Sequence, residues 1–280
     1  MEIYADGHFL PLDAPVLAAG DRGFLQGEAV YESLKVQSRR ALFLEAHLER
    51  LSGSAAALGI PDLWDAAEAR HAIGALLSRA GLSDATARLY LTAGPPGGAP
   101  VRIARVEPPP PWAEPGQPPW RIVTHPERVV PYLPRVKHVS RLAHARARRA
   151  AREQGADDAL LVHADGWALE GTASNVFFFE ADTLHTPGLD CGVLAGITRD
   201  AILDLAPRCG FFVVEGRYPP EVVAASDECF LSFTSAGVRP VASLDGTDFP
   251  GGAPGPRTAR LSEAYAARMA EALAAAEPLS

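Results

Sequence analysis

Only two lysines, Lys35 and Lys137, stand among the 26 basic residues of the chain, and the other 24 are arginines. Lys137 lies in the segment RVKHVSRLAHARARR, residues 135–149, where the other basic side chains are arginine and histidine. A guanidinium does not deprotonate in proteins, whereas a desolvated lysine amine can lose its proton and attack a carbonyl. Position 137 therefore indicates either an amine that forms a Schiff base or an ordinary surface cation that has stayed lysine.

A carboxylate in the second half of the chain is a further candidate for chemistry. Glu170 begins the motif EGTASN, residues 170–175, directly before the apolar run VFFFE. A carboxylate at the mouth of a buried strand is costly unless a cation or a hydrogen-bond donor pairs with it. The alternative is a glutamate exposed in a turn.

Three further motifs could bind an anion. The motif LAGITRDAIL, residues 194–203, begins a helix whose first amides have no intrahelical partner, and FTSAG, residues 233–237, places hydroxyls on a turn. The helical motif HLERL, residues 47–51, adds an arginine that could otherwise be a surface charge. The candidate donors are Gly196, Ile197, Thr198, Thr234, Ser235 and Arg50.

An amine, a carboxylate and several phosphate donors form the set that pyridoxal 5′-phosphate requires. Its aldehyde needs an amine, and its phosphate needs amides, hydroxyls and an arginine. Its ring nitrogen needs an acidic partner that keeps a proton there, so that the ring can withdraw electrons. The sequence therefore predicts this cofactor.

The composition limits the class of protein. With 280 residues, 48% of them hydrophobic, the chain can form one large domain or two smaller ones. The net charge of −8 disfavours a nucleic-acid partner. The start MEIYADGHF lacks the regions of a signal peptide, and no apolar run reaches membrane-spanning length. The three cysteines show no metal-binding or redox spacing, which predicts free thiols in the cytoplasm.

The chain is expected to consist of two domains. The segment VEPPPPWAEPGQPPWR, residues 106–121, is too rich in proline for a helix or a central strand. It predicts an interdomain linker at residues 107–120, between a small α/β domain at residues 1–106 and a large cofactor-binding domain at residues 121–280. A long surface loop within one domain is the alternative.

Periodicity and turn residues predict a mixture of strands and helices, an α/β (α+β) fold class. In the first part, a hairpin turns at Asp6-Gly7, strands lie at 29–36, 87–94 and 101–106, and helices lie at 44–59 and 65–80. In the second part, strands are predicted at 120–125, 158–166, 171–180, 183–188, 211–216 and 228–235, and helices at 138–154, 196–210 and 258–275. The domains are expected to meet at a cleft.

The chain resembles the class IV, or fold-type IV, pyridoxal-phosphate aminotransferases, which include branched-chain and D-amino acid aminotransferases, (R)-amine transaminases and aminodeoxychorismate lyase. The most specific match runs from Glu170 to Arg199, as E-x-T-x-x-N-V-F, then L-x-T, then L-x-G-I-x-R. Further matches are DRGFLQGEAVYESLKV, HLERL, VKHVSRL and ECFLSFTSAGVRPVASLDG. The resemblance implies a small α/β domain, a larger pseudo-barrel domain and a homodimer.

The resemblance also implies roles for matching residues. Lys137 would form the Schiff base and move a proton between the substrate Cα and the cofactor C4′. Glu170 would pair with the pyridine nitrogen, and Tyr31 would face the substrate. The residues implied for the phosphate are Arg50, Ile197, Thr198 and Thr234.

At two motifs the chain differs from the family in residues expected to bind a substrate carboxylate. D-amino acid aminotransferases often carry an arginine where this chain has Ala93, in TAGPPGGAP. The branched-chain enzymes carry GTAAE where this chain has FTSAG. We expect either Arg88, on the strand entering the first motif, or the amides near Ser235 and Ala236 to bind the carboxylate. A surface position for Arg88 is the alternative.

The leading functional prediction is transamination between an amino acid and a 2-oxo acid, with small molecules as the only partners besides a second copy of the chain. The alternative is aminodeoxychorismate lyase, which releases pyruvate, because KHVSRL and the DGW turn at residues 165–167 resemble motifs of the lyases. A non-catalytic protein on this fold is disfavoured, because a protein without activity has no physical reason to keep Lys137, Glu170 and Arg50 together.

Overall fold

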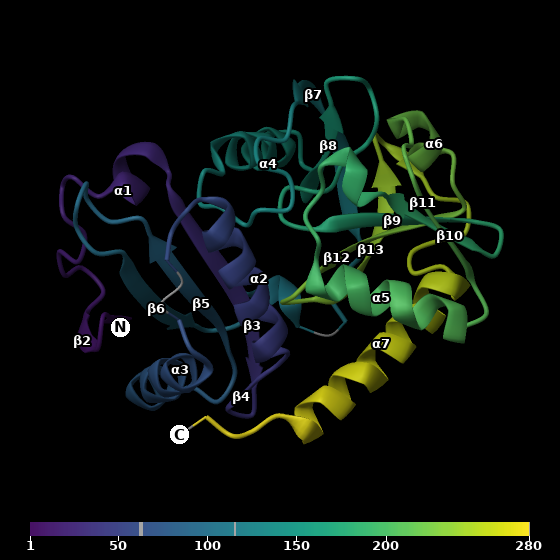
Figure 1. Ribbon diagram of the computed structural model, residues 1–280. Coiled ribbons are helices and arrows are strands. Elements are labelled where there is room, and N and C mark those ends of the chain that lie inside the picture. Colours follow the sequence, from purple (N-terminus) through teal and green to yellow (C-terminus); the bar gives the residue numbers. More distant parts are fainter. Residues whose placement is uncertain (62–63, 115, 280) are drawn as a thin grey trace. The chain divides into compact units, whose positions relative to one another are not determined.

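A computed structural model describes residues 1–61, 64–114 and 116–279 (Figure 1). The chain divides into two compact units. Unit 1 contains Met1–Glu114, Val136–Ser140 and Met269–Ser280, and unit 2 contains Pro115–Arg135 and Arg141–Arg268. The short segment Val136–Ser140, which carries Lys137, thus clusters with unit 1. The predicted domain limits at residues 106 and 121 stay a prediction.

Unit 1 is built on a six-stranded antiparallel sheet with the order β2-β1-β6-β5-β3-β4. The predicted hairpin at Asp6-Gly7 is confirmed, because both residues have positive φ and join β1 to β2 in register. The strands are β1 (Glu2–Ala5), β2 (His8–Pro11), β3 (Ala29–Gln37), β4 (Arg40–Ala41), β5 (Ala85–Thr92) and β6 (Val101–Glu107).

The helices α2 (Leu44–Ala57) and α3 (Ala66–Ala80) share one hydrophobic core with this sheet, and a short helix α1 (Arg22–Gln26) precedes β3. On β3, Val30 and Leu34 point into the core and are fully buried, while Tyr31, Ser33 and Lys35 on the other face are half-buried. This alternation is the one expected of the strand that the sequence predicted at residues 29–36. It determines which side chains of β3 stand beside α2.

Unit 2 contains an eight-stranded mixed sheet with the order β11-β10-β9-β12-β13-β7-β8, and β14 pairs with β13. Strands β9 and β12 are almost fully buried, and Phe177 and Phe230 stack between them with ring centres 5.0 Å apart. The strands are β7 (Trp120–Val129), β8 (Asp158–His163), β9 (Asn175–Glu180), β10 (Thr183–Pro187), β11 (Phe212–Gly216), β12 (Glu228–Phe233), β13 (Gly237–Leu244) and β14 (Thr247–Asp248).

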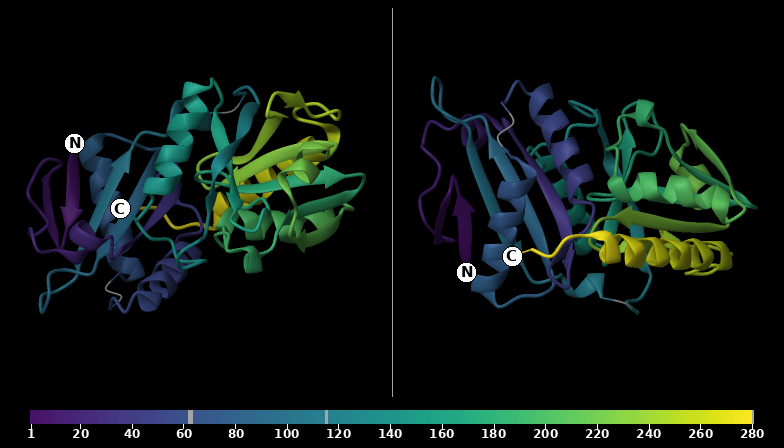
Figure 2. Two further views of the ribbon diagram at one scale, coloured as in Figure 1. Left: turned by 90° about the horizontal axis from the view of Figure 1, so that it is seen from above. Right: turned by 60° about the horizontal axis from the view of Figure 1, so that its bottom comes forward.

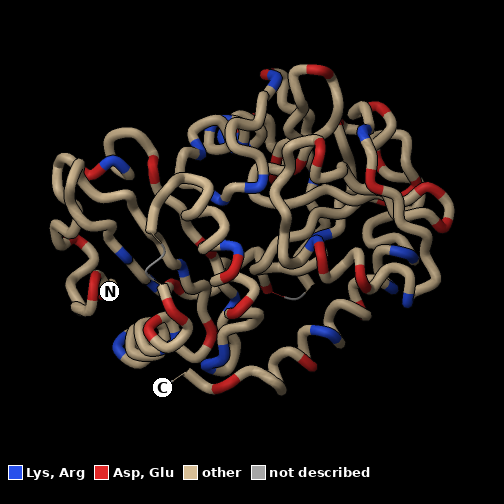
Figure 3. Tube along the Cα trace, viewed as in Figure 1, with Lys and Arg blue, Asp and Glu red and all other residues tan. Residues whose placement is uncertain are grey.

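Unit 2 also contains three helices and the greater part of a fourth, because its limit at Arg268 lies within the last helix. Figure 2 shows the last of them, α7, along its length, and Figure 3 shows basic residues along α4, a pattern typical of a solvated helix face. The helices are α4 (Leu142–Glu153), α5 (Ile197–Arg208), α6 (Pro220–Ala224) and α7 (Pro256–Ala275), and single 3₁₀ turns lie at Pro111–Ala113 and Leu189–Cys191. In the part of the chain that the structure describes, no helix combines the length and the apolar character of a membrane span.

The predicted helix at residues 138–154 is wrong in its first turn, because α4 begins at Leu142. His138 instead forms a β-bridge with Val30, and the Val139 amide donates to the Ala29 carbonyl at 3.0 Å. These are pairings with residues more than 100 positions away, so local periodicity could not reveal them. The strand β13 was also not predicted, and the predicted strand at residues 171–180 begins only at Asn175.

The substitution Gly27→Ala tests how tightly the segment of Lys137 is packed against unit 1. Gly27 has φ +75°, and a Cβ there would lie 2.0 Å from Ser140 Oγ. Gly7 has φ +89° with no atom within 4 Å of a Cβ, so Gly7→Ala is a matched control with backbone strain alone, about 1–2 kcal/mol. We expect Gly27→Ala to lower the melting temperature clearly more than Gly7→Ala does.

Adding Ser140→Ala to Gly27→Ala removes the nearest contact of the new Cβ. The double variant should therefore recover most of the additional loss of melting temperature that Gly27→Ala shows relative to Gly7→Ala. Equal losses for the two glycine variants in thermal melts would show that Ser140 does not restrain this position.

Candidate functional site

The backbone of Lys137 is held by hydrogen bonds on both sides of the residue. The Tyr31 amide donates to the Lys137 carbonyl at 3.0 Å, and the Lys137 amide donates to Ser54 Oγ of α2 at 3.1 Å. The lysine amine Nζ lies 4.8 Å from the centre of the Tyr31 ring. The structure therefore brings together the predicted Schiff-base lysine and the tyrosine predicted to face the substrate.

Arg88 lies on the same face of the sheet as Tyr31. In the register of β3 and β5, Tyr31 is opposite Tyr90 and Ser33 is opposite Arg88. The two tyrosine rings stack with centres 5.9 Å apart, and Arg88 Nη2 lies 2.7 Å from Glu107 Oε1. Arg88 is thus half-buried beside the tyrosines and already paired with a carboxylate.

Arg50 forms a two-point ion pair with Glu32, a residue that the sequence reading did not select. Arg50 Nε donates to Glu32 Oε1 at 2.6 Å, and Arg50 Nη2 donates to Oε2 at 2.8 Å. His47 Nδ1 lies 2.7 Å from the same Oε2. Because α2 places His47 and Arg50 on one side, three residues apart, both reach the single carboxylate of β3.

Burial and hydrogen bonding act in opposite directions on Glu32. Burial by itself raises the pKa of Glu32, but hydrogen bonds from His47 and Arg50 outweigh it and lower the pKa to about 2. Burial lowers the pKa of His47. Since an ionised carboxylate only accepts, His47 Nδ1 carries the proton of their hydrogen bond, and the ring is a neutral donor.

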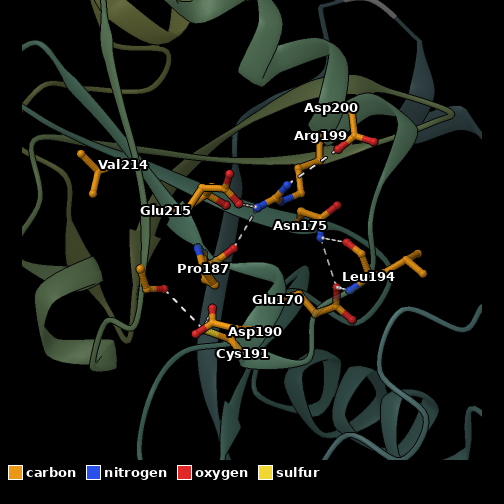
Figure 4. Close-up of polar contacts among 12 residues, drawn as sticks. Glu170, Asn175, Pro187, Asp190, Cys191, Leu194, Arg199, Asp200, Val214 and Glu215 are labelled. Atoms are coloured by element: carbon orange, nitrogen blue, oxygen red, sulfur yellow. Dashed lines mark hydrogen bonds and ion pairs between the residues drawn. The ribbon is translucent and has the colours of Figure 1, made fainter.

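In unit 2, Asn175 connects Glu170 to the segment before α5 (Figure 4). Asn175 Nδ2 donates to Glu170 Oε2 at 3.2 Å and to the Leu194 carbonyl at 2.9 Å, and the Leu194 amide donates to Glu170 Oε2 at 3.1 Å. The half-buried Glu170 therefore has the donors that its position before a buried strand requires.

The N-terminus of α5 follows directly from this cluster. Its N-cap is Gly196, and no side chain caps it, so the amides at Ile197 and Thr198 face an end of the helix suited to an anion. A Cβ at position 196 would lie 2.2 Å from Asn175 Oδ1, which requires glycine there. Buried Arg199 anchors the helix through Glu215 and the Pro187 carbonyl.

The other predicted ligands of unit 2 lie on one turn. Thr234, Ser235 and Ala236 form the half-buried turn between β12 and β13, as the sequence predicted for the hydroxyls after an apolar strand. Phe233, just before the turn, stacks on Trp120 with ring centres 5.3 Å apart. This turn is therefore anchored by an aromatic pair.

The residues present suit pyridoxal phosphate in chemical type. Unit 1 offers the amine of Lys137 beside an aromatic ring and the guanidinium of Arg50. Unit 2 offers the hydrogen-bonded carboxylate of Glu170 and the helix end at Ile197 without a side-chain cap. Each unit therefore offers groups of the chemical types that the aldehyde, the phosphate and the ring nitrogen of the cofactor require.

Sequence reasoning missed Glu32, His47 and Asn175. A signal for Glu32 was present, because the alternation of β3 places this carboxylate on the same face as Val30 and Leu34. A charged residue on the apolar face of a strand requires a partner. Asn175 stands in the signature E-x-T-x-x-N-V-F but received no role, because its contact with Leu194 depends on the fold.

Comparison with known proteins identifies the relatives of this chain. The profile of the family described as Amino-transferase class IV matches residues 29–244. A Methanocaldococcus jannaschii protein, provisionally named a branched-chain-amino-acid aminotransferase, is 30% identical over 95% of each chain. The D-alanine aminotransferase of Bacillus licheniformis is 27% identical over 94% of this chain and 95% of its own.

Solved structures show the same fold. The branched-chain amino acid aminotransferase of Thermobaculum terrenum in its PLP form has a TM-score of 0.86 and 23% identity, over 100% of this chain and 98% of that chain. The predicted fold class and the predicted family resemblance are therefore confirmed. The relatives described here are all named aminotransferases, which does not favour the lyase alternative.

The free energy of unfolding should fall at acid pH in a way that depends on Glu32. The ordinary pKa of a glutamate is 4.5 and the folded value is about 2, so the stabilising contribution is complete above pH 4.5 and is lost as the pH falls from 4.5 to 2. The difference corresponds to about 3 kcal/mol. We expect the stability gap between wild type and Glu32→Gln, measured by denaturant unfolding, to narrow over this range.

The exposed Glu49 of α2 provides the control, because Glu49→Gln removes the same charge without touching the ion pair. A gap between wild type and Glu32→Gln that stays constant from pH 5 to pH 2 would contradict the assigned pKa.

Proposed function

The chain belongs to the class IV amino-transferases, which use pyridoxal 5′-phosphate, and on that premise we propose that it transfers an amino group between an amino acid and a 2-oxo acid through Lys137. The observation that carries this proposal is the position of the lysine amine, 4.8 Å from the Tyr31 ring. Hydrogen bonds hold the Lys137 backbone, so the side chain extends toward the cofactor from a fixed position.

Lys137 Nζ would bind the cofactor and, when displaced by the substrate amine, take a proton from the substrate Cα. When bound, pyridoxal phosphate supplies the aldehyde and the ring that withdraws electrons from Cα. Glu170 would hold a proton at the pyridine nitrogen. The two hydrogen bonds from Asn175 and Leu194 orient its carboxylate for that contact.

Four residues would hold the phosphate. Ile197 and Thr198 contribute amides at the start of α5, where the helix dipole favours an anion. The buried Thr198 hydroxyl also forms a side-chain hydrogen bond with Tyr265. The Tyr265 ring packs against Gly237 at the start of β13. Arg50 and Thr234 complete the proposed set.

We propose a branched-chain or a D-amino acid as the amino donor, since relatives over nearly the full chain carry both names. Arg88 is the proposed cation for the substrate carboxylate, because it shares a sheet face with Tyr31. The amides near Ser235 and Ala236, on the half-buried turn after β12, are the alternative grip.

We also propose a cytoplasmic homodimer. The dimer rests on the family architecture. The cytoplasmic location is supported by Cys191, Cys209 and Cys229, which are all free thiols in the structure, as expected of a protein in a reducing compartment.

Lys137→Arg should abolish transamination, because a guanidinium cannot form an imine with the cofactor. Borohydride reduction of the wild-type holoenzyme should attach the cofactor to the peptide that contains Lys137. Lys35→Arg is the matched control, since it replaces the only other lysine, and it should keep the attachment. Attachment at Lys35 in the wild type would refute the assignment.

Arg88→Ala should raise KM for amino acids about 10–100-fold, the range expected when one charge-assisted hydrogen bond to a carboxylate is lost. Turnover of an (R)-amine, which has no carboxylate, should change little. Arg105→Ala is the control, because Arg105 is half-buried, sits opposite Arg88 and pairs with the same Glu107. Equal loss on amines and amino acids would reject Arg88 as the carboxylate ligand.

A further inference from the structure

We propose that Glu32 and His47 are positioning residues that orient Arg50 for the cofactor phosphate. The inference rests on the proposed role of Arg50 as a phosphate ligand. It assigns a function to two buried side chains in unit 1 that are joined by a hydrogen bond. Neither side chain exposes any surface, and both are polar.

The ion pair fixes the plane of the guanidinium. Glu32 receives the Nε–H and one Nη2–H of Arg50, at 2.6 and 2.8 Å, which is a side-on, two-point contact. A two-point contact sets the orientation as well as the position of the group. An arginine has five N–H donors, so three are directed to places other than Glu32.

Glu32 is itself held rigidly. Its Oε2 accepts from the Ser33 amide at 3.2 Å and from His47 Nδ1 at 2.7 Å, in addition to the contact with Arg50. The carboxylate is therefore fixed by the backbone of β3 and by the ring on α2. Any motion of Arg50 relative to the sheet would break at least one of these hydrogen bonds.

The neutral state of His47 is consistent with its surroundings. Its Nε2 is buried and, within residues 1–61, 64–114 and 116–279, has no hydrogen-bond partner. A protonated ring would need an acceptor there, so a neutral ring is favoured. With neutral His47, the charges of Glu32 and Arg50 cancel, and the cluster of three residues has no net charge.

This cancellation makes the proposal testable. The negative charge of Glu32 weakens the attraction between Arg50 and a phosphate, so the carboxylate can favour phosphate binding only by orienting the guanidinium. If orientation dominates, removing the carboxylate weakens phosphate binding. If charge cancellation dominates, removing it strengthens phosphate binding.

The experiment compares pyridoxal 5′-phosphate with pyridoxal, which lacks the phosphate. Both ligands are titrated by absorbance against the full-length protein after the resident cofactor has been removed. We expect Glu32→Gln to weaken binding of pyridoxal phosphate by up to about 30-fold, the factor that corresponds to the rotamer entropy of an arginine, and to change pyridoxal binding less than twofold. Glu49→Gln, which removes a neighbouring exposed charge, should alter neither ligand.

Arg50→Ala should show the same selectivity, and Glu32→Gln combined with Arg50→Ala should be no weaker than Arg50→Ala alone. If Glu32→Gln does not fold, His47→Leu offers a second test, because it removes one hydrogen bond from the carboxylate. It should weaken the binding of pyridoxal phosphate, by less than Glu32→Gln would, and leave the binding of pyridoxal unchanged. His47→Asn, which keeps a donor near Nδ1, should restore the affinity for pyridoxal phosphate.

Two results would overturn the positioning role of Glu32 and His47 without affecting the proposed phosphate role of Arg50. These are an equal loss on both ligands in Glu32→Gln while Arg50→Ala stays selective, or tighter binding of pyridoxal phosphate to Glu32→Gln. An equal loss on both ligands in Arg50→Ala would instead reject Arg50 as a phosphate ligand, and this inference with it. Failure of wild type to bind either ligand would reject the proposed function.

Discussion

The position of Lys137 depends on the pairing between β3 and the five residues Val136–Ser140. The hydrogen bonds of Tyr31 and Ala29 to this segment form a short antiparallel ladder beside a strand that belongs to the sheet. Residues on either side of the segment belong to unit 2. Lys137 is consequently placed by β3, a strand about 100 residues earlier in the chain, and not by the helix that follows it in sequence.

Because side chains alternate along a strand, β3 supplies two different environments. Tyr31 stands on the face of Lys137, and Glu32 stands in the core beside α2. A shift of one residue in the register would exchange these faces and bury the tyrosine in place of the carboxylate. The proposed amine and the proposed phosphate ligand Arg50 therefore depend on the same register of the same strand.

The sequence allowed prediction of most local elements and of the family, but not of contacts between distant residues. The turn at Asp6-Gly7, the alternation of β3 and the helix that carries Arg50 follow from local turn chemistry and periodicity. The first turn of the predicted helix at residue 138 was wrong because pairing with β3 overrides the helical preference of this segment. Asn175 was missed because its role depends on Leu194 and Gly196, which only the fold brings near.

Arg88, the proposed cation for the substrate carboxylate, already has a carboxylate partner in the structure. A half-buried guanidinium without a counter-charge would be costly, and Glu107 at 2.7 Å provides one. If Arg88 binds a substrate as proposed, exchange of the Glu107 carboxylate for the substrate carboxylate would keep the number of ion pairs at Arg88 unchanged. Glu107 also contacts Arg105 at 3.4 Å, so it would keep a cationic partner after the exchange. Because Glu107 would keep Arg105 as a partner, we expect the release of Arg88 toward a substrate to cost less than the breaking of an isolated ion pair.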